Sequence, residues 1–146
     1  MKKYFFFCIL LLLPIIGIAQ TYKYIGVEDG LSNRRVYAIQ KGPKGYMWFL
    51  THDGIDRYNG KEFKPYKLMD GDEEVNSMMN LNWLYVDSKG TIWEIGKKGR
   101  VFRYDTKHDR FVLVYKLPES EVKGRPTSIS YGFVDANSVI WLCNED

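Results

Sequence analysis

Short apolar segments alternate with polar, glycine-containing turns along most of the chain. In the first group, the segments expected to form strands are residues 36–39, 46–51, 55–58 and 61–66. The turns between them are GlyProLysGly at 42–45, HisAspGly at 52–54 and AsnGly at 59–60. Segments of this length, rich in aromatic and β-branched residues, favour strands and are too short for an amphipathic helix. AsnGly tolerates the positive φ of a tight primed hairpin turn, so we predict four antiparallel strands here.

The same order of segments returns twice further along the chain. In the second group, the expected strands are residues 81–86, 91–96, 100–104 and 110–115, with turns at 87–90, 98–99 and 106–109. The third group has expected strands at 128–134 and 139–143 around a turn at 135–138, and holds half of the pattern. The chain is therefore predicted to be all-β, with about two and a half units of four antiparallel strands each.

A tryptophan marks the period of this repetition. GlyTyrMetTrp at 45–48 returns as GlyThrIleTrp at 90–93 and SerValIleTrp at 138–141, so the tryptophans lie 45 and 48 residues apart. The recurring positions are Trp48, Trp93 and Trp141, with Gly45 and Gly90 three residues earlier and Gly54 and Gly99 six residues later. A four-stranded unit repeated at this spacing is typical of a β-propeller blade. We expect the three tryptophans to pack between blades.

The predicted organisation begins with a signal peptide. Lys2 and Lys3 precede an apolar run over residues 4–18, which is too short to span a bilayer and ends in small residues, so we expect cleavage between Ala19 and Gln20. A retained anchor is the alternative. The expected divisions are a signal peptide at 1–19, a lead-in segment at 20–33, blade 1 at 34–75, blade 2 at 76–121 and a partial blade 3 at 122–146.

The number of blades bears on completeness. A closed ring needs about four to eight blades, and the open faces of an incomplete ring would be adhesive. We therefore expect this chain to be the start of a longer protein, with a truncated product as the alternative.

Charge and cysteine content exclude some functions. Without residues 1–19 the chain carries 19 basic and 18 acidic residues, which is not the basic surface of a nucleic-acid-binding protein. The cluster of Lys97, Lys98 and Arg100 is interpreted as a solvated hairpin end. Removal of Cys8 with the signal peptide leaves Cys143 alone, so no internal disulfide is expected. Cys143 lies in an apolar strand, where burial is favoured over a role as a reactive thiol.

The sequence offers little for catalysis. His52 and His108 both fall in predicted turns, and neither belongs to a metal-binding or catalytic motif. The acidic run at 70–74 lacks the ligand spacing of a calcium loop and is interpreted as a solvated connection between blades. We expect no catalytic residues, no metal and no cofactor in this chain.

Candidate ligand-binding residues come from two places. Trp83 and Tyr131 are less regular than the repeated tryptophans and lie near strands that can reach a surface, where aromatic faces stack on sugar rings, although packing is the alternative. Arg34 and Arg35 precede the first strand and are suited to an anionic sugar, or else form a solvated loop.

Two stretches resemble a known family. Residues 24–33, TyrIleGlyValGluAspGlyLeuSerAsn, resemble the opening of the two-component regulator propellers. Residues 48–60 resemble the blade motif of that family and include its AsnGly turn. The family usually has glycine two residues after the tryptophan, where this chain has Leu50, Ile95 and Cys143. The residues that follow the tryptophans, Phe49, Glu94 and Leu142, rule out the TrpAsp signature of WD repeats.

The resemblance implies a function. Proteins of this type are exported and use N-terminal propellers as periplasmic sensors, followed by an inner-membrane helix and a cytoplasmic histidine kinase that acts as a dimer. Hybrid versions add a receiver and a DNA-binding region, and many sense oligosaccharides. The chain is thus expected to be a periplasmic sensing fragment that binds an oligosaccharide, contacts no nucleic acid itself and signals to a kinase outside this sequence. The alternative is a free exported propeller that acts as a binding or scaffold protein.

Overall fold

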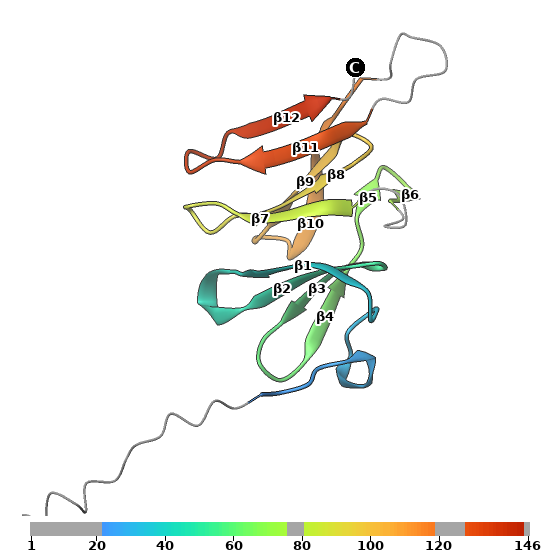
Figure 1. The fold of residues 1–146 in the computed structure, drawn as a ribbon, viewed down its shortest axis with the longest axis vertical. Helices are drawn as coiled ribbons and strands as arrows, with labels where there is room; N and C mark the ends of the chain where they lie inside the picture. Colours follow the sequence, from blue (N-terminus) through green and yellow to red (C-terminus); the bar gives the residue numbers. More distant parts are fainter. Residues whose placement is uncertain (1–21, 76–80, 119–127, 145–146) are drawn as a thin grey trace, which may run out of the picture.

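The computed structural model describes residues 22–75, 81–118 and 128–144, and these residues form antiparallel sheets with two short 3₁₀ turns, Val27–Asp29 and Pro43–Gly45. The sheets are stacked one above another along the long axis of the molecule (Figure 1). The predicted signal peptide, with Ala19 and Gln20, lies outside the described residues. In the described part of the chain, no helix is long and apolar enough to span a membrane.

The first sheet is a four-stranded meander. Its strands are β1 (Val36–Lys41), β2 (Met47–Thr51), β3 (Gly54–Tyr58) and β4 (Phe63–Tyr66), in the order β1-β2-β3-β4. The turn after β3 is longer than the predicted two-residue hairpin, because Tyr58 pairs with Phe63. The Asn59 side chain accepts hydrogen bonds from the backbone N–H groups of Lys61 and Glu62, both at 2.9 Å, which stabilises a four-residue loop instead.

The second sheet repeats this meander, and the third repeats its first two strands. The strands β7 (Leu81–Val86), β8 (Ile92–Gly96), β9 (Arg100–Asp105) and β10 (Arg110–Lys116) form the second sheet, and β11 (Ile129–Val134) pairs with β12 (Ile140–Asn144) in the third. The predicted all-β fold with blades of four antiparallel strands is confirmed. A small pair that the sequence did not predict, β5 (Met69–Asp70) and β6 (Glu73–Glu74), lies between the first two sheets in the sequence.

A β-bulge recurs at the same place in each sheet. The register between the first and second strands shifts between Val36 and Ala38, between Leu81 and Trp83, and between Ile129 and Tyr131. Bulges increase the local twist of a strand. The first strands of the three sheets, β1, β7 and β11, therefore bend in the same way, and they lie side by side (Figure 1).

The core lies between sheets. Trp48, 2% exposed, contacts the rings of Tyr104 and Phe111 from the second sheet, with ring centroids 4.8 and 5.9 Å away. Trp93 is also buried, in a cluster with Ile129 and Val134 of the third sheet. These contacts bury one face of each sheet on the next.

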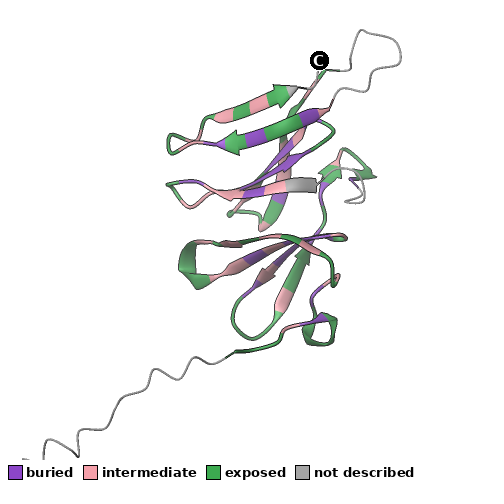
Figure 2. Cartoon of the chain, in the orientation of Figure 1, coloured by how far each residue is buried: buried purple, intermediate pink, exposed green. Residues whose placement is uncertain are grey.

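The face of the third sheet is different. Trp141 is 60% exposed, and Figure 2 shows β12 without buried residues. Cys143 on the same strand is exposed, so the expectation that it is buried was wrong. The physical reason is that side chains alternate along β12: Ile140 and Leu142 pack toward the second sheet, whereas Cys143 lies on the opposite face, which no other described segment covers.

Candidate functional site

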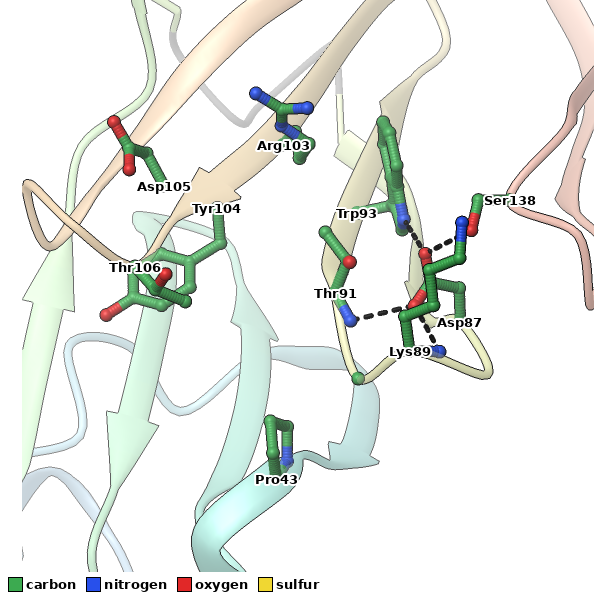
Figure 3. A pocket seen from close by; sticks show the side chains of 11 residues that line it. Pro43, Asp87, Lys89, Thr91, Trp93, Arg103, Tyr104, Asp105, Thr106 and Ser138 are labelled. Atoms are coloured by element: carbon green, nitrogen blue, oxygen red, sulfur yellow. Dashed lines mark hydrogen bonds between the residues drawn. The ribbon is translucent and has the colours of Figure 1, made fainter.

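Two cavities open at opposite ends of the strands. The larger has a volume of about 590 Å³ and is bounded by the turns β7–β8, β9–β10 and β11–β12 together with Pro43 (Figure 3). The smaller, about 240 Å³, is lined by Asn33, Arg34, Arg35 and His52. In a meander the β1–β2 turn and the β2–β3 turn lie at opposite ends, which separates the two cavities.

Asp87 organises the β7–β8 turn beside the larger cavity. One carboxylate oxygen accepts the backbone N–H groups of Lys89 and Thr91 at 3.0 and 2.8 Å. The other accepts Trp93 Nε1–H at 3.0 Å and the Ser138 hydroxyl of the third sheet at 2.8 Å (Figure 3). Burial raises the pKa of Asp87, but these hydrogen bonds outweigh it and lower the pKa to about 2. The carboxylate is thus a fixed anion with its oxygens already occupied.

The third copy has the same turn and the first does not. Asp135 accepts Trp141 Nε1–H at 3.1 Å and two backbone N–H groups of its turn. In the first copy Gly42 stands at this place, and Trp48 Nε1 is buried without a hydrogen-bond partner among the described residues. A Cβ at Gly42 would lie 2.4 Å from that nitrogen, so the close approach of the indole excludes an aspartate there.

The turn between the first and second strands of each sheet has the same conformation at its repeated position. Gly45 and Gly90 both adopt left-handed φ values, +77° and +80°, and Ser138 at the equivalent third position adopts +66°. Serine occupies this conformation at a cost that glycine avoids. The repeat therefore preserves the turn conformation even where it loses the glycine.

The smaller cavity contains the predicted arginine pair. Arg34 and Arg35 are exposed, and no hydrogen bond or ion pair within the described ranges engages either guanidinium. Their segment is fixed to the β2–β3 turn, because Arg35 N–H donates to Asn33 Oδ1 at 2.8 Å and His52 N–H donates to the Arg35 carbonyl at 3.0 Å. The Tyr37 hydroxyl lies 3.0 Å from His52 Nδ1. This arrangement offers two free cations and an aromatic edge to an anionic ligand.

The predicted aromatic pair forms a separate group. Trp83 and Tyr131 meet edge to face with ring centroids 6.1 Å apart, between β7 and β11. Tyr85 and Phe133 repeat this contact one step along the same strands, at 6.0 Å. Trp83 is half-buried and Tyr131 exposed. In the described structure, no hydrogen bond or ring contact connects the aromatic pair with the arginine pair.

Tyr37 was missed by the sequence analysis, which also took His52 for a turn residue only. The signal for both was weak, because Tyr37 lies on a bulged strand and His52 in a turn, so neither follows the alternation that marks a face. His108, the other predicted turn histidine, lies 2.6 Å from Asp105 and its hydrogen bond lowers the pKa of that carboxyl.

Acidic residues are placed less simply than the sequence suggested. Asp70, expected in a solvated connection, accepts hydrogen bonds from Arg100 at 2.7 Å and Lys116 at 2.8 Å. These bonds lower the pKa of Asp70 and connect the β5–β6 segment to the second sheet. Arg100 is thus largely buried rather than part of a solvated hairpin end. The described residues contain no group of three side chains suited to hold a metal ion.

Two carboxyl groups are buried in the sheets. Asp56 accepts the backbone N–H and the hydroxyl of Ser32 at 2.9 and 2.6 Å, which connects the lead-in segment to β3. Burial raises the pKa of Asp56 more than these hydrogen bonds lower it. Glu94 on β8 has no hydrogen-bond partner for either oxygen among the described residues, and burial raises its pKa well above the usual value. Glu94 is therefore a buried acid of the second sheet that lines neither cavity.

The comparison with protein families decides the type of repeat. Residues 30–53 match the model described as two component regulator propeller. The chain carries a two component regulator propeller repeat. The match covers the end of the lead-in segment, β1, β2 and the turn after β2, including Arg34, Arg35 and His52 of the smaller cavity.

Solved structures share the propeller fold. An extracellular domain described as part of the hybrid two component system BT3049 from B. thetaiotaomicron aligns with a TM-score of 0.55 at 22% identity, over 83% of this chain and 17% of that one. The corresponding domain of BT4673 from the same organism aligns with a TM-score of 0.58 at 19% identity, over 80% of this chain and 15% of that one. The propeller-repeat chain thus spans less than a fifth of the length of these structures. A comparison with curated proteins gave no match.

Proposed function

We propose that this chain is the N-terminal part of an extracytoplasmic, ligand-sensing propeller of a two-component system. The observation that carries the proposal is the match of residues 30–53 to the two component regulator propeller. The fold shared with extracellular domains of two component systems supports it. In this proposal residues 1–19 direct export, residues 34–75, 76–121 and 122–146 belong to successive blades, and a histidine kinase outside this sequence receives the signal.

The ligand proposed is an oligosaccharide that carries an acidic sugar. Arg34 and Arg35, whose guanidinium groups have no hydrogen bond or ion pair with another described residue, border a cavity with Asn33 and His52. Arginine binds carboxylates through paired hydrogen bonds. Tyr37 on β1 and Tyr131 on β11 supply exposed aromatic faces, and such faces pack against the apolar sides of sugar rings.

A binding experiment tests the ligand class. The purified protein is titrated by calorimetry with uronic-acid oligosaccharides and with neutral oligosaccharides of the same length. We expect preferential binding of the acidic series and a loss of roughly tenfold or more in affinity in the R34Q/R35Q variant. The R110Q variant removes an exposed arginine at the opposite end of the strands and is expected to leave the affinity unchanged. Equal binding of both series, or equal loss in R110Q, would contradict the proposal.

The sensor role is tested separately from the ligand. The reading frame that encodes this chain is expected to continue into a hydrophobic span and a histidine kinase. A frame that completes a propeller without a span or kinase would instead support a free exported binding or scaffold protein.

A further inference from the structure

One carboxylate of the second sheet is held by side chains of the first. Asp109, in the β9–β10 turn at a left-handed φ of +50°, accepts hydrogen bonds from Arg57 at 3.1 Å and the Tyr66 hydroxyl at 2.6 Å. Lys64 of the first sheet and Tyr104 of the second donate to it as well. Burial raises the pKa of Asp109, but the hydrogen bonds and the charge of Arg57 lower it well below its usual range. An acidic hairpin turn thus binds a basic, phenolic face of the preceding sheet.

The second sheet has an arginine and a tyrosine at the positions equivalent to Arg57 and Tyr66. Arg57 pairs across its sheet with Trp48, and Arg103 pairs with Trp93. Tyr66 is the partner of Ile55, and Tyr115 is the partner of Val101, which holds the corresponding place on β9. Arg103 and Tyr115 therefore occupy the positions that Arg57 and Tyr66 occupy in the first sheet.

These two side chains have no polar partner among the described residues. Arg103 is exposed and Tyr115 is 43% exposed, and neither side chain has a hydrogen bond or ion pair with another described residue. The third sheet packs through β11 on β7 and β8. Arg103 lies instead in the wall of the 590 Å³ cavity, and no hydrogen bond reaches it in Figure 3. The nearest acid along its strand, Asp105, is paired with His108.

We propose that Arg103 and Tyr115 form a binding site for the carboxylate of an aspartate on an acidic β-hairpin turn that packs beyond the second sheet. The equivalent register argues for a hairpin, because Arg57 and Tyr66 bind Asp109, which lies in the β9–β10 hairpin turn. Charge complementarity argues for the acid, because the arginine guanidinium pairs with a carboxylate through charge-assisted hydrogen bonds. In the first sheet the cross-strand partner of Arg57 is Lys64, which adds a second cation. In the second sheet the cross-strand partner of Arg103 is Val112, so the proposed site has one cation fewer.

A hairpin of known sequence serves as the probe. A fluorescently labelled peptide of residues 100–116, cyclised at its ends to hold the hairpin, is titrated with the full chain and followed by anisotropy. The matched peptide carries Asp109→Asn. We expect the aspartate peptide to bind roughly tenfold more tightly than the asparagine peptide.

Variants of the full chain assign that preference to the site. The R103M and Y115F variants are expected to reduce the preference to about twofold or less, whereas R110M, which removes a neighbouring exposed arginine, keeps it. Y115F removes only a hydroxyl, so circular dichroism is expected to show an unchanged fold even if R103M is less stable. Absence of binding, equal affinity for the two peptides, or a preference that survives both R103M and Y115F would overturn the proposal.

Discussion

At the residue scale, Glu94 is the side chain least suited to its surroundings. It is 0% exposed, and its cross-strand partners Leu84 and Phe102 are buried and apolar. The equivalent positions after the other two tryptophans hold Phe49 and Leu142. An acid without a partner in such a place remains protonated, because the ionised form loses its hydration.

Replacement of this acid by an apolar residue should stabilise the protein in a pH-dependent way. Folded Glu94 has a pKa raised above the ordinary 4.5, so the wild-type protein loses stability as the pH rises from 4.5 toward the folded-state value. We expect Glu94→Leu to be more stable than wild type at pH 7 by about 1–3 kcal/mol, with the difference shrinking toward pH 4. Urea unfolding at several pH values measures this.

The matched control is the exposed acid Glu28. Glu28→Leu is expected to change stability little and equally at all pH values. A Glu94→Leu variant that is less stable than wild type at pH 7 would mean that the carboxylate has a partner in solution. The sequence did not reveal that Glu94 is buried. All five residues of β8 are buried, so the strand lacks the alternation of apolar and polar positions that would mark an inward-facing acid.

At the element scale, most strands were predictable and two features were not. The turns at 42–45, 52–54 and 106–109 separate apolar segments clearly, and each predicted strand is present. The hairpin after β3 was predicted with the wrong length, because the Asn59 side chain binds two backbone N–H groups of its own loop. The pair β5 and β6 has two residues per strand, which is too short for any periodic signal.

The repeated turn glycines should differ in their tolerance of substitution. Gly45 and Gly99 have φ values of +77° and +79°, so alanine at either site is strained by about 1–2 kcal/mol. At Gly45 the added Cβ meets nothing within 4 Å, whereas at Gly99 it would lie 2.4 Å from Leu117 Cβ. Leu117 N–H also donates to the Gly99 carbonyl at 2.7 Å, so relief of the clash disturbs that bond.

We therefore expect Gly99→Ala to lower the free energy of unfolding by at least about 1 kcal/mol more than Gly45→Ala. Thermal or urea unfolding of the two single variants provides the comparison, and each serves as the other's control. Equal losses would show that Leu117 moves away freely and that φ alone determines the cost.

At the scale of the whole molecule, the arrangement of sheets followed from the repeat, but the candidate site did not. The tryptophan spacing predicts equivalent sheets, and equivalent sheets stack in equivalent ways. The two proposed sites were found through contacts between distant residues, Tyr37 with His52 for the ligand and Asp109 with Arg57 for the hairpin. No local pattern encodes these pairs, since each joins a strand of one hairpin to a turn of another.

The two ends of the stack present different apolar surfaces. Tyr131, Phe133 and Trp141 are exposed on the third sheet, and Tyr37 and Ile39 are exposed on the first. Inside the molecule, the tryptophan-bearing face of one sheet packs on the opposite face of the next sheet. Trp48 of the first sheet, the equivalent of Trp141, packs in this way on the second sheet. A surface of one type is therefore complementary to the other type on a second copy, which gives a head-to-tail contact.

The purified protein is accordingly expected to self-associate, and two variants can each disrupt one of the two contacting surfaces. Ile39→Lys disables one surface and Trp141→Lys the other, so each variant alone should be monomeric at concentrations where the wild type forms larger species. An equal mixture of the two still contains one intact pair of surfaces and should form a heterodimer but nothing larger. Light scattering after size exclusion measures all four samples. A wild-type monomer would contradict the expected contact, and a mixture that stays monomeric would show that the association does not proceed head to tail.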